Sequence, residues 1–154
     1  MNRPLDTTDL RLIAELRRAP RATIVQLAAS IGISRGTVHA RLRRLEDDGV
    51  ITAYGPDVDA SAAGLSVLAF CTLEIQQGSH AATVAALERI PQILEIHTVT
   101  GTGDLLCRIV ARSNDHLHDV LQQVASLATV RRTQTQLALS TSLQRTIADL
   151  LARH

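Results

Sequence analysis

Small and basic side chains share one run of the sequence, residues 34–44, and together they could bind nucleic acid. Arginine can pair with guanine edges or phosphates, small residues allow a close approach, and a threonine methyl can contact thymine. The candidate DNA-binding residues are Ser34, Arg35, Gly36, Thr37, His39, Ala40, Arg41, Arg43 and Arg44. The alternative is a solvated helix face whose arginines pair in part with Glu46, Asp47 and Asp48.

A glycine-rich segment, Thr100-Gly101-Thr102-Gly103-Asp104, could bind a small charged molecule. Gly101 and Gly103 let the backbone approach a ligand or adopt positive φ, which exposes N–H groups to a carboxylate. Asp104 offers a counter-charge to an ammonium group. These features suit an amino-acid zwitterion, and an ordinary Gly-Asp hairpin turn is the alternative interpretation.

The histidines and cysteines do not predict a metal or catalytic site. His116 and His118 lie two residues apart on a predicted helix, so they face apart, and no cysteine or carboxylate set completes a metal site. No phosphate loop, nucleophile elbow or paired acid–base set occurs, so we expect no catalytic residue. Cys71 and Cys107 lack Cys-x-x-Cys spacing. We interpret them as small core thiols in a reducing compartment, with a redox role as the alternative.

Three closely spaced helix starts position the arginine-bearing run. Each start has an N-cap residue followed three positions later by a residue able to reach back: Asp6 with Asp9, Thr23 with Gln26, and Ser34. Gly32 suits the end of the second helix and lies two residues before the third start. Two helices joined by so tight a turn predict a helix-turn-helix.

Within the third helix, Val38, Leu42 and Leu45 follow i, i+4, i+7 spacing and predict one buried stripe. At about 100° per residue, the residues predicted to point away from the core are Gly36, Thr37, Ala40, Arg43 and Arg44. Arg35 then lies at the exposed N-terminus, and His39 and Arg41 lie on the flanks. Gly49 ends this helix, and residues 50–59 predict a short strand and turn, a small wing.

From residue 65 the hydrophobic period changes to that of a sheet with covering helices. The predicted order is strand, helix, strand, strand, helix, strand over residues 65–75, 79–90, 92–100, 104–111, 114–127 and 129–140. This β-α-β-β-α-β pattern is ferredoxin-like, with the first and third strands as neighbours, which would bring Cys71 close to Cys107. Residues 142–154 predict an amphipathic last helix, in which Leu143, Ile147, Leu150 and Leu151 recur at helical spacing.

Both faces of the first predicted strand are apolar. Ala69 and Leu73 lie on one face, while Leu68 and Phe70 lie on the other. Two helices can cover only one face of the sheet, so the other predicts burial against a second subunit. We therefore expect a homodimer that pairs sheet to sheet.

Length and composition bound these interpretations. The chain has 154 residues, 45% of them hydrophobic and 20% charged, which suits a folded protein of one or two small domains. Aromatic residues make up only 1%, which argues against a haem or flavin pocket walled with aromatics. Residues 1–50 carry nine basic and six acidic side chains (+3), whereas the other 104 carry seven and nine (−2). No transmembrane or secretory segment is predicted, so we expect a cytoplasmic protein without membrane contact.

Together these motifs resemble the Lrp/AsnC (feast/famine) family of transcriptional regulators. The resemblance runs from about residue 5 to residue 140, and its carriers are Leu5-Asp6-x-x-Asp9, the block 27–59 and the segment VTGTGD at 99–104. It implies an α+β protein with a winged helix-turn-helix joined to a ligand-sensing domain. It also implies dimers through that second domain and commonly a tetramer of dimers.

The resemblance further implies small effectors, usually amino acids, around the loop that matches Thr100–Asp104. By position on the last strand, Thr133, Gln134 and Thr135 are further effector-binding candidates. The chain departs from the family at two places. A bulky residue is common where Thr102 or Gly103 stands, and the usual polar C-terminal ending is replaced by the amphipathic helix.

We therefore predict a DNA-binding domain with its linker over residues 1–65, a βαββαβ effector-binding and oligomerisation domain over 66–140, and a C-terminal amphipathic helix over 141–154. The predicted function is a sequence-specific, double-stranded DNA-binding regulator controlled by an amino acid, without cofactor or metal. One alternative is an enzyme like the sirohaem decarboxylases, whose layout is similar and for which His97 and Arg108 are the nearby candidates. The other is an effector-independent DNA architectural protein.

Overall fold

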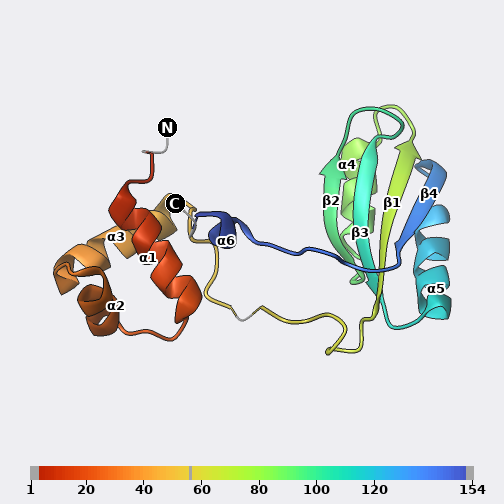
Figure 1. The fold of residues 1–154 in the computed structure, drawn as a ribbon. Coiled ribbons are helices and arrows are strands. Elements are labelled where there is room, and N and C mark those ends of the chain that lie inside the picture. The colour runs from red at the N-terminus through yellow and green to blue at the C-terminus, as the bar shows by residue number, and fades with distance from the viewer. Residues whose placement is uncertain (1–3, 56, 152–154) are drawn as a thin grey trace. The chain divides into compact units, whose positions relative to one another are not determined.

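The computed structural model describes residues 4–55 and 57–151 and divides the chain into two compact units. Unit 1 comprises Met1–Asp57 with Ser142–His154, and unit 2 comprises Val58–Thr141. Figure 1 shows the elements of both units: α1 (Thr7–Arg18), α2 (Ile24–Ile31), α3 (Arg35–Asp47), β1 (Val67–Ile75), α4 (His80–Leu87), β2 (Ile93–Thr98), β3 (Leu105–Ala111), α5 (Asn114–Ala125), β4 (Val130–Ala138) and α6 (Ile147–Leu151).

Local capping starts the first three helices of unit 1, α1 to α3, where the sequence predicts them. At the start of α1, Asp9 N donates to Asp6 Oδ1 at 2.9 Å, and Asp6 N donates to Asp9 Oδ2 at 3.1 Å. A second reciprocal pair links Thr23 with Gln26 before α2. Gly32 ends α2 at a φ of 79°, which glycine adopts without steric cost. The helix-turn-helix of α2 and α3 is thereby confirmed.

The core of unit 1 is aliphatic and joins α1, α2 and α3. Its fully or nearly fully buried members include Leu12, Leu27, Val38 and Leu45, with Leu42 packed at the edge. The buried stripe predicted for the third helix is therefore confirmed. Burying these side chains stabilises the unit by about 1.5–3 kcal/mol each.

The predicted C-terminal helix is wrong in length, and of its four predicted apolar residues only Leu151 is packed. Within the described residues it spans only Ile147–Leu151, and residues 152–154 lie outside them. Ala148 and Leu151 pack against the core of unit 1, whereas Leu143, Ile147 and Leu150 are 64%, 72% and 55% exposed. Spacing alone could not choose between these faces, because the docking surface belongs to α1 and its neighbours.

The strand predicted just after α3 is also wrong for the described residues 50–55 and 57–59. Val50 N and Ile51 N both donate to Leu45 O, at 2.8 and 3.0 Å. These N–H groups close the end of the helix and so cannot start a strand ladder. The segment passes through Gly49, at a φ of 68°, without forming a strand.

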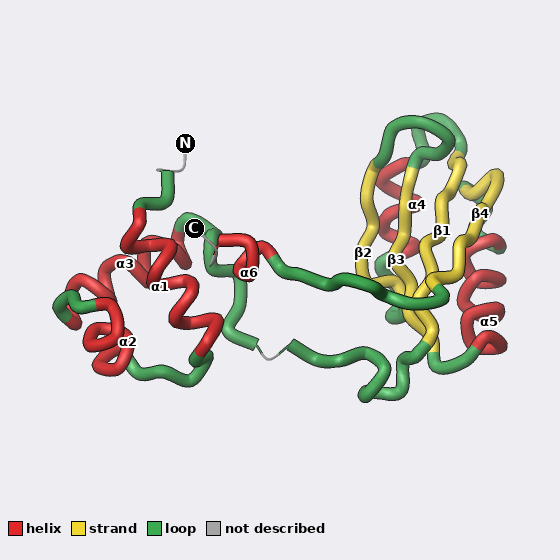
Figure 2. The backbone as a smooth tube through the Cα atoms, viewed as in Figure 1, coloured by secondary structure: helices red, strands yellow, loops and turns green. Residues whose placement is uncertain are grey.

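Unit 2 is a four-stranded antiparallel sheet with the order β2-β3-β1-β4, which confirms the ferredoxin-like prediction (Figure 2). Residues from α4 and α5, including Leu87, Val120 and Val124, are buried against one face of the sheet. Cys71 pairs directly with Cys107 across β1 and β3, as predicted, and both are free, buried thiols. Burial raises the pKa of both thiols, that of Cys107 to about 12.

The other face of the sheet is the open face, defined here by Leu68, Phe70, Leu106, Arg108 and Glu95. Along each strand these residues alternate with the core-facing positions, so their side chains lie on the opposite face of the sheet. The helices α4 and α5 pack on the core-facing side, so neither covers the open face.

No described helix is long and apolar enough to cross a membrane.

Candidate DNA-binding and effector sites

The N-terminal end of α3 is capped and exposed. Ser34 Oγ accepts from Thr37 N at 3.1 Å, and the two hydroxyl oxygens lie 2.8 Å apart. The exposed members of the predicted DNA-binding set are Ser34, Arg35, Gly36, Thr37, His39, Ala40 and Arg43. The N-terminal two and a half turns of α3 therefore present small, polar and basic groups to solvent.

Two arginines on this surface have no partner. Arg35 and Arg43 make no hydrogen bond or ion pair with any residue in the described part of the chain. Glu46, one of the acidic residues considered as their partner, instead accepts from the hydroxyl of Tyr54 at 2.5 Å. The free guanidinium groups are therefore available to an external anion.

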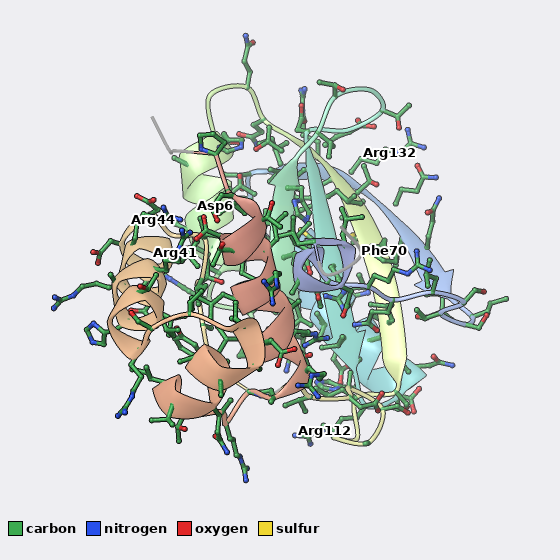
Figure 3. The ribbon with its side chains drawn as sticks, turned by 60° about the vertical axis from the view of Figure 1, so that its left-hand side comes forward. Asp6, Arg41, Arg44, Phe70, Arg112 and Arg132 are labelled. Carbon is green, nitrogen blue, oxygen red and sulfur yellow. The ribbon has the colours of Figure 1, made fainter. Side chains whose placement is uncertain are left out.

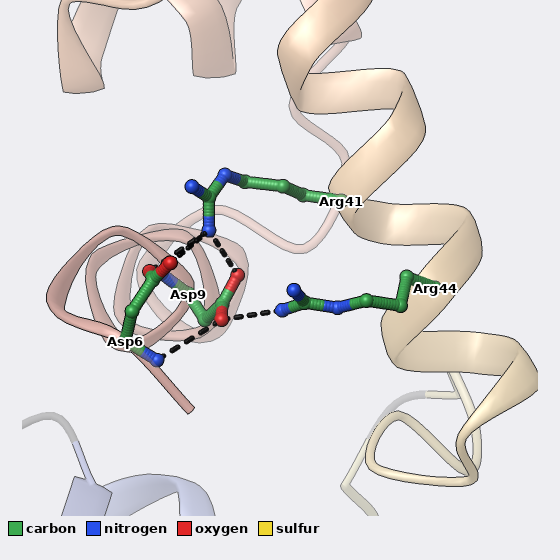
Figure 4. A network of polar contacts seen from close by, with 4 residues as sticks. All are labelled: Asp6, Asp9, Arg41 and Arg44. Atoms are coloured by element: carbon green, nitrogen blue, oxygen red, sulfur yellow. Dashed lines mark hydrogen bonds and ion pairs between the residues drawn. The ribbon is translucent and has the colours of Figure 1, made fainter. Parts of the chain in front are cut away.

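Arg41 and Arg44 do not belong to that exposed surface, so the predicted outward direction of Arg44 is wrong. Both side chains reach from α3 to Asp6 and Asp9 at the start of α1 (Figures 3 and 4). They are three residues apart on one flank of α3, and that flank faces α1. Periodicity places a side chain around its own helix but does not say which neighbouring helix lies beside it.

Gly36 has no role in the packing of its own unit. A Cβ at this position would meet nothing closer than Ser34 Oγ at 3.9 Å, and φ is not in the left-handed region. Glycine is less favourable than alanine within a helix by roughly 0.5–1 kcal/mol. The packing of unit 1 therefore does not require a glycine at this position.

The loop between β2 and β3, residues 100–104, is tied to β1. Gly101 has a φ of 107°, and a Cβ on Gly103 would lie 2.3 Å from Thr72 Cγ2. Asp104 N donates to Leu73 O at 2.8 Å, and Asp104 Oδ2 accepts from Ile75 N at 2.8 Å. Both glycines and one carboxylate oxygen thus serve the fold.

A shallow hollow of about 530 Å³ lies beside this loop and is called here the loop hollow. Its lining comprises Glu74, Ile75, Gly101, Thr102, Gly103, Asp104, Arg131, Arg132 and Gln134. Arg131 and Asp104 also line an adjoining hollow with His80 and Thr98. The loop hollow therefore combines two carboxylates with two guanidinium groups.

The last strand contributes different residues from those the sequence predicts. Gln134 lines the loop hollow, but Thr133 and Thr135 pair in register with Leu73 and Cys71, so they share the core-facing side of the sheet. Thr135 Oγ1 donates to Cys71 Sγ at 3.4 Å. Sequence reasoning missed Glu74, Arg131 and Arg132, and the adjacent arginine pair that opens the last strand was the available signal.

The two residues considered for a tetrapyrrole enzyme, His97 and Arg108, both bind the carboxylate of Glu95. Glu95 binds His97 at 3.1 Å and Arg108 at 2.6 Å on the open face. The hydrogen bond from His97, followed by that from Arg108, lowers the pKa of Glu95. Among residues 4–55 and 57–151, no three His, Cys, Asp or Glu side chains gather to hold a metal ion.

Two family models match the chain. The Lrp/AsnC ligand binding domain matches residues 68–148, and a winged helix-turn-helix DNA-binding domain matches residues 5–52. The HTH-type transcriptional regulator FL11 of Pyrococcus horikoshii is 29% identical over 146 residues, which cover 95% of this chain and 97% of that protein.

Solved structures agree over nearly the whole length. E. coli AsnC superposes with a TM-score of 0.89 at 25% identity, covering 95% of this chain and 99% of that chain. The regulator NMB0573 of Neisseria meningitidis, solved as a complex with L-Met, gives a TM-score of 0.84 at 25% identity and covers 93% and 95%. The chain therefore belongs to the Lrp/AsnC family of DNA-binding transcriptional regulators, which are not enzymes, and carries that family's ligand-binding domain.

Proposed function

We propose that this regulator binds double-stranded DNA sequence-specifically as a homodimer or tetramer of dimers, and that an amino acid bound at subunit interfaces modulates this binding. The single observation that carries the DNA part is the exposed first turn of α3. It presents Arg35 beside Gly36, a glycine that the fold does not require, and Arg43 follows two turns along the same helix; neither arginine has a partner among the described residues. A helix end of this kind fits the major groove, where small residues permit approach and arginine can read guanine.

The open face of unit 2 supports a dimer. Its apolar members Leu68, Phe70 and Leu106 are only partly buried within the single chain. The same face contains the paired charges of Glu95 and Arg108. Stacking this face on that of a second copy buries the apolar side chains and repeats the same contacts across a twofold axis.

The loop hollow supports an amino-acid effector. Arg131 has no partner among the described residues and can bind a carboxylate. Asp104 uses Oδ2 for the backbone of Ile75, which leaves Oδ1 for an ammonium group, and Glu74 adds a second carboxylate on the same hollow. The hollow is open on its outer side, so a neighbouring subunit would complete it.

An effector at such an interface can change the spacing of paired α3 helices. The effector must then bind one arrangement of subunits better than the other, by about 1–3 kcal/mol of coupling free energy. The amino acid seen with the Neisseria relative belongs to that protein and makes L-Met a sensible first member of the test panel here.

Binding of the full chain to a duplex from its own upstream promoter region tests this proposal. Fluorescence anisotropy at one stated salt concentration, with and without each common amino acid, should show tight binding that one amino acid changes about fivefold or more. Asp104→Asn keeps an acceptor for Ile75 N but removes the charge, so it should bind DNA normally and lose the response.

Three outcomes contradict parts of the proposal. No binding at low salt contradicts the DNA part. Binding that no amino acid alters contradicts effector control and favours an architectural role. An unchanged response in Asp104→Asn removes Asp104 from the effector site.

A further inference from the structure

A cluster of four charged side chains joins α1 to α3. It consists of Asp6, Asp9, Arg41 and Arg44 (Figure 4). Asp9 is the one charged side chain that is fully buried among the residues the structure describes. A buried carboxylate is costly unless charged partners surround it, so the contacts of Asp9 decide what this cluster does.

Both oxygens of Asp9 are bound to arginines of α3. Arg41 Nη1 donates to Asp9 Oδ1 at 2.7 Å, and Arg44 Nη2 donates to Asp9 Oδ2. Arg41 Nη1 also lies 2.8 and 2.7 Å from the two oxygens of Asp6. The two guanidinium groups are thus neutralised pairwise by the two carboxylates.

The pairing divides the four arginines of α3 into two kinds. The side chains of Arg41 and Arg44 are 24% and 28% exposed and bound within the protein. Arg35 and Arg43 are exposed and unpartnered among the described residues. A phosphate that took Arg44 from Asp9 would leave a buried carboxylate with one fewer partner, whereas a phosphate at Arg43 breaks nothing.

The geometry points to a division of labour in which Arg35 and Arg43 contact DNA while Asp9 withholds Arg41 and Arg44 from it. This inference rests on the proposed function, because it concerns the same helix. Asp9 is a positioning residue: it fixes α3 against α1 and never meets the DNA. Arg41 and Arg44 accordingly leave the set of DNA-contacting residues predicted from the sequence.

Withholding two cations per subunit has a consequence for specificity. Binding to arbitrary DNA comes essentially from phosphate neutralisation, and each phosphate contact contributes about 0.9 to the slope of log K against log salt. A regulator that keeps two of its four helix arginines away from phosphate binds arbitrary sequences more weakly. Its preference for the correct sequence is thereby larger.

Arg43→Gln and Arg44→Gln form a matched pair of variants, since the two residues are neighbours on one helix. Titration of promoter duplex over a range of salt concentrations should show that Arg43→Gln weakens binding about fivefold or more. Arg44→Gln should leave the salt slope unchanged. The slope does not depend on the fraction of folded protein, so it separates lost DNA contacts from local destabilisation.

A third variant tests the positioning role. Asp9→Asn retains an oxygen to accept from Asp6 N but removes the charge that holds Arg44, while Arg41 keeps its contacts with Asp6. We expect tighter binding to non-promoter duplex, a salt slope steeper by about one per subunit from the released Arg44, and a smaller ratio of promoter to non-promoter affinity. If Asp9 only stabilised the fold, binding would weaken with the slope unchanged.

The inference and the proposed function fail differently. Wild-type protein that does not bind DNA overturns both. If the wild-type protein binds DNA, and Arg43→Gln and Arg44→Gln weaken binding equally and reduce the salt slope equally, the division of labour alone is overturned. An Asp9→Asn variant without a steeper slope overturns the positioning role of Asp9.

Discussion

Two glycine-containing segments, at the start of α3 and before β3, have opposite relations to the fold. A Cβ on Gly36 would meet only Ser34 Oγ at 3.9 Å, whereas one on Gly103 would lie 2.3 Å from Thr72 Cγ2. The fold needs Gly103 and does not need Gly36. A glycine that the fold does not require is therefore a better indicator of a binding surface than a glycine that the fold requires.

The charged residues of the same two segments show the same contrast. Arg43 on α3 has no partner among the described residues, while Asp104 already accepts a hydrogen bond from Ile75. The proposed DNA-binding surface therefore carries groups that have no partner among the described residues. In the loop hollow, by contrast, Asp104 has one carboxylate oxygen bound within the fold, while Arg131 has no partner among the described residues.

The largest effect that can break this contrast is expected from Gly103→Ala. The added methyl group overlaps Thr72 Cγ2, and overpacking of this kind costs about 1–3 kcal/mol. Thermal or denaturant unfolding should show that loss. Thr72→Ser removes the overlapping methyl and should restore much of it.

Gly101→Ala is the control for that rescue. Its penalty comes from a φ of 107° in open space, so Thr72→Ser should not relieve it. Equal rescue of both variants, or a Gly103→Ala protein as stable as the wild type, would show that the close approach to Thr72 is not what requires glycine.

Gly36→Ala should stabilise the fold and weaken DNA binding. The helix gains up to about 1 kcal/mol of stability, because alanine replaces glycine in open space. Promoter binding should weaken by about 1–2 kcal/mol, roughly fivefold to thirtyfold, because the methyl group holds the helix away from DNA. Parallel melting curves and anisotropy titrations measure both. Unchanged promoter affinity would place the first turn of α3 outside the DNA interface.

Acid sensitivity tests the charge cluster at the start of α1. The hydrogen bond from Arg41, then that from Asp9 N, lowers the pKa of Asp6 to about 2. Because the unfolded value is near 4, the ionised native state is favoured: the stabilisation is complete above about pH 4 and is lost as pH falls to about 2.

Asp6→Asn supplies the comparison for this acid window. The difference in unfolding temperature between wild type and variant should be constant above about pH 4 and shrink toward zero near pH 2. A difference that stays the same across this range would mean that the pKa of Asp6 does not differ between the folded and unfolded states.

The smallest expected effect concerns the C-terminal helix. Arg17 Nε donates to Asp149 Oδ1 at 3.2 Å, with the two side chains 36% and 34% exposed. An ion pair this open is worth at most about 1 kcal/mol. Arg17→Ala removes this ion pair and the one with Asp57, so it should lower the unfolding free energy of unit 1 by at most about 1 kcal/mol for each pair. Leu151→Ala, which removes core packing, should lower it further. A larger loss from Arg17→Ala would contradict the view that packing holds α6.

Local rules predicted the elements of both units, and contacts between elements account for what they missed. Capping depends on residues three apart, so Asp6 with Asp9 and Thr23 with Gln26 marked their helix starts from sequence alone. Alternating hydrophobicity likewise predicted the strands and, through the ferredoxin-like order, the pairing of Cys71 with Cys107.

The missed features all depend on tertiary neighbours. The direction of Arg44 depends on where α1 lies, and the need for Gly103 depends on the position of Thr72 in β1. The start of α6 had a usable signal, since Thr146 and Asp149 form a reciprocal capping pair. Its length and buried face still depend on the surface that it packs against.

A hydroxyl-radical footprint of the wild-type chain on its own promoter region tests the central claim most directly. Paired α3 helices in successive major grooves predict protected half-sites about one helical turn, 10–10.5 base pairs, apart. Addition of the effective amino acid should alter the spacing or strength of that pattern. Protection without phase along the duplex, unaffected by every amino acid, would contradict effector-controlled recognition by paired helices.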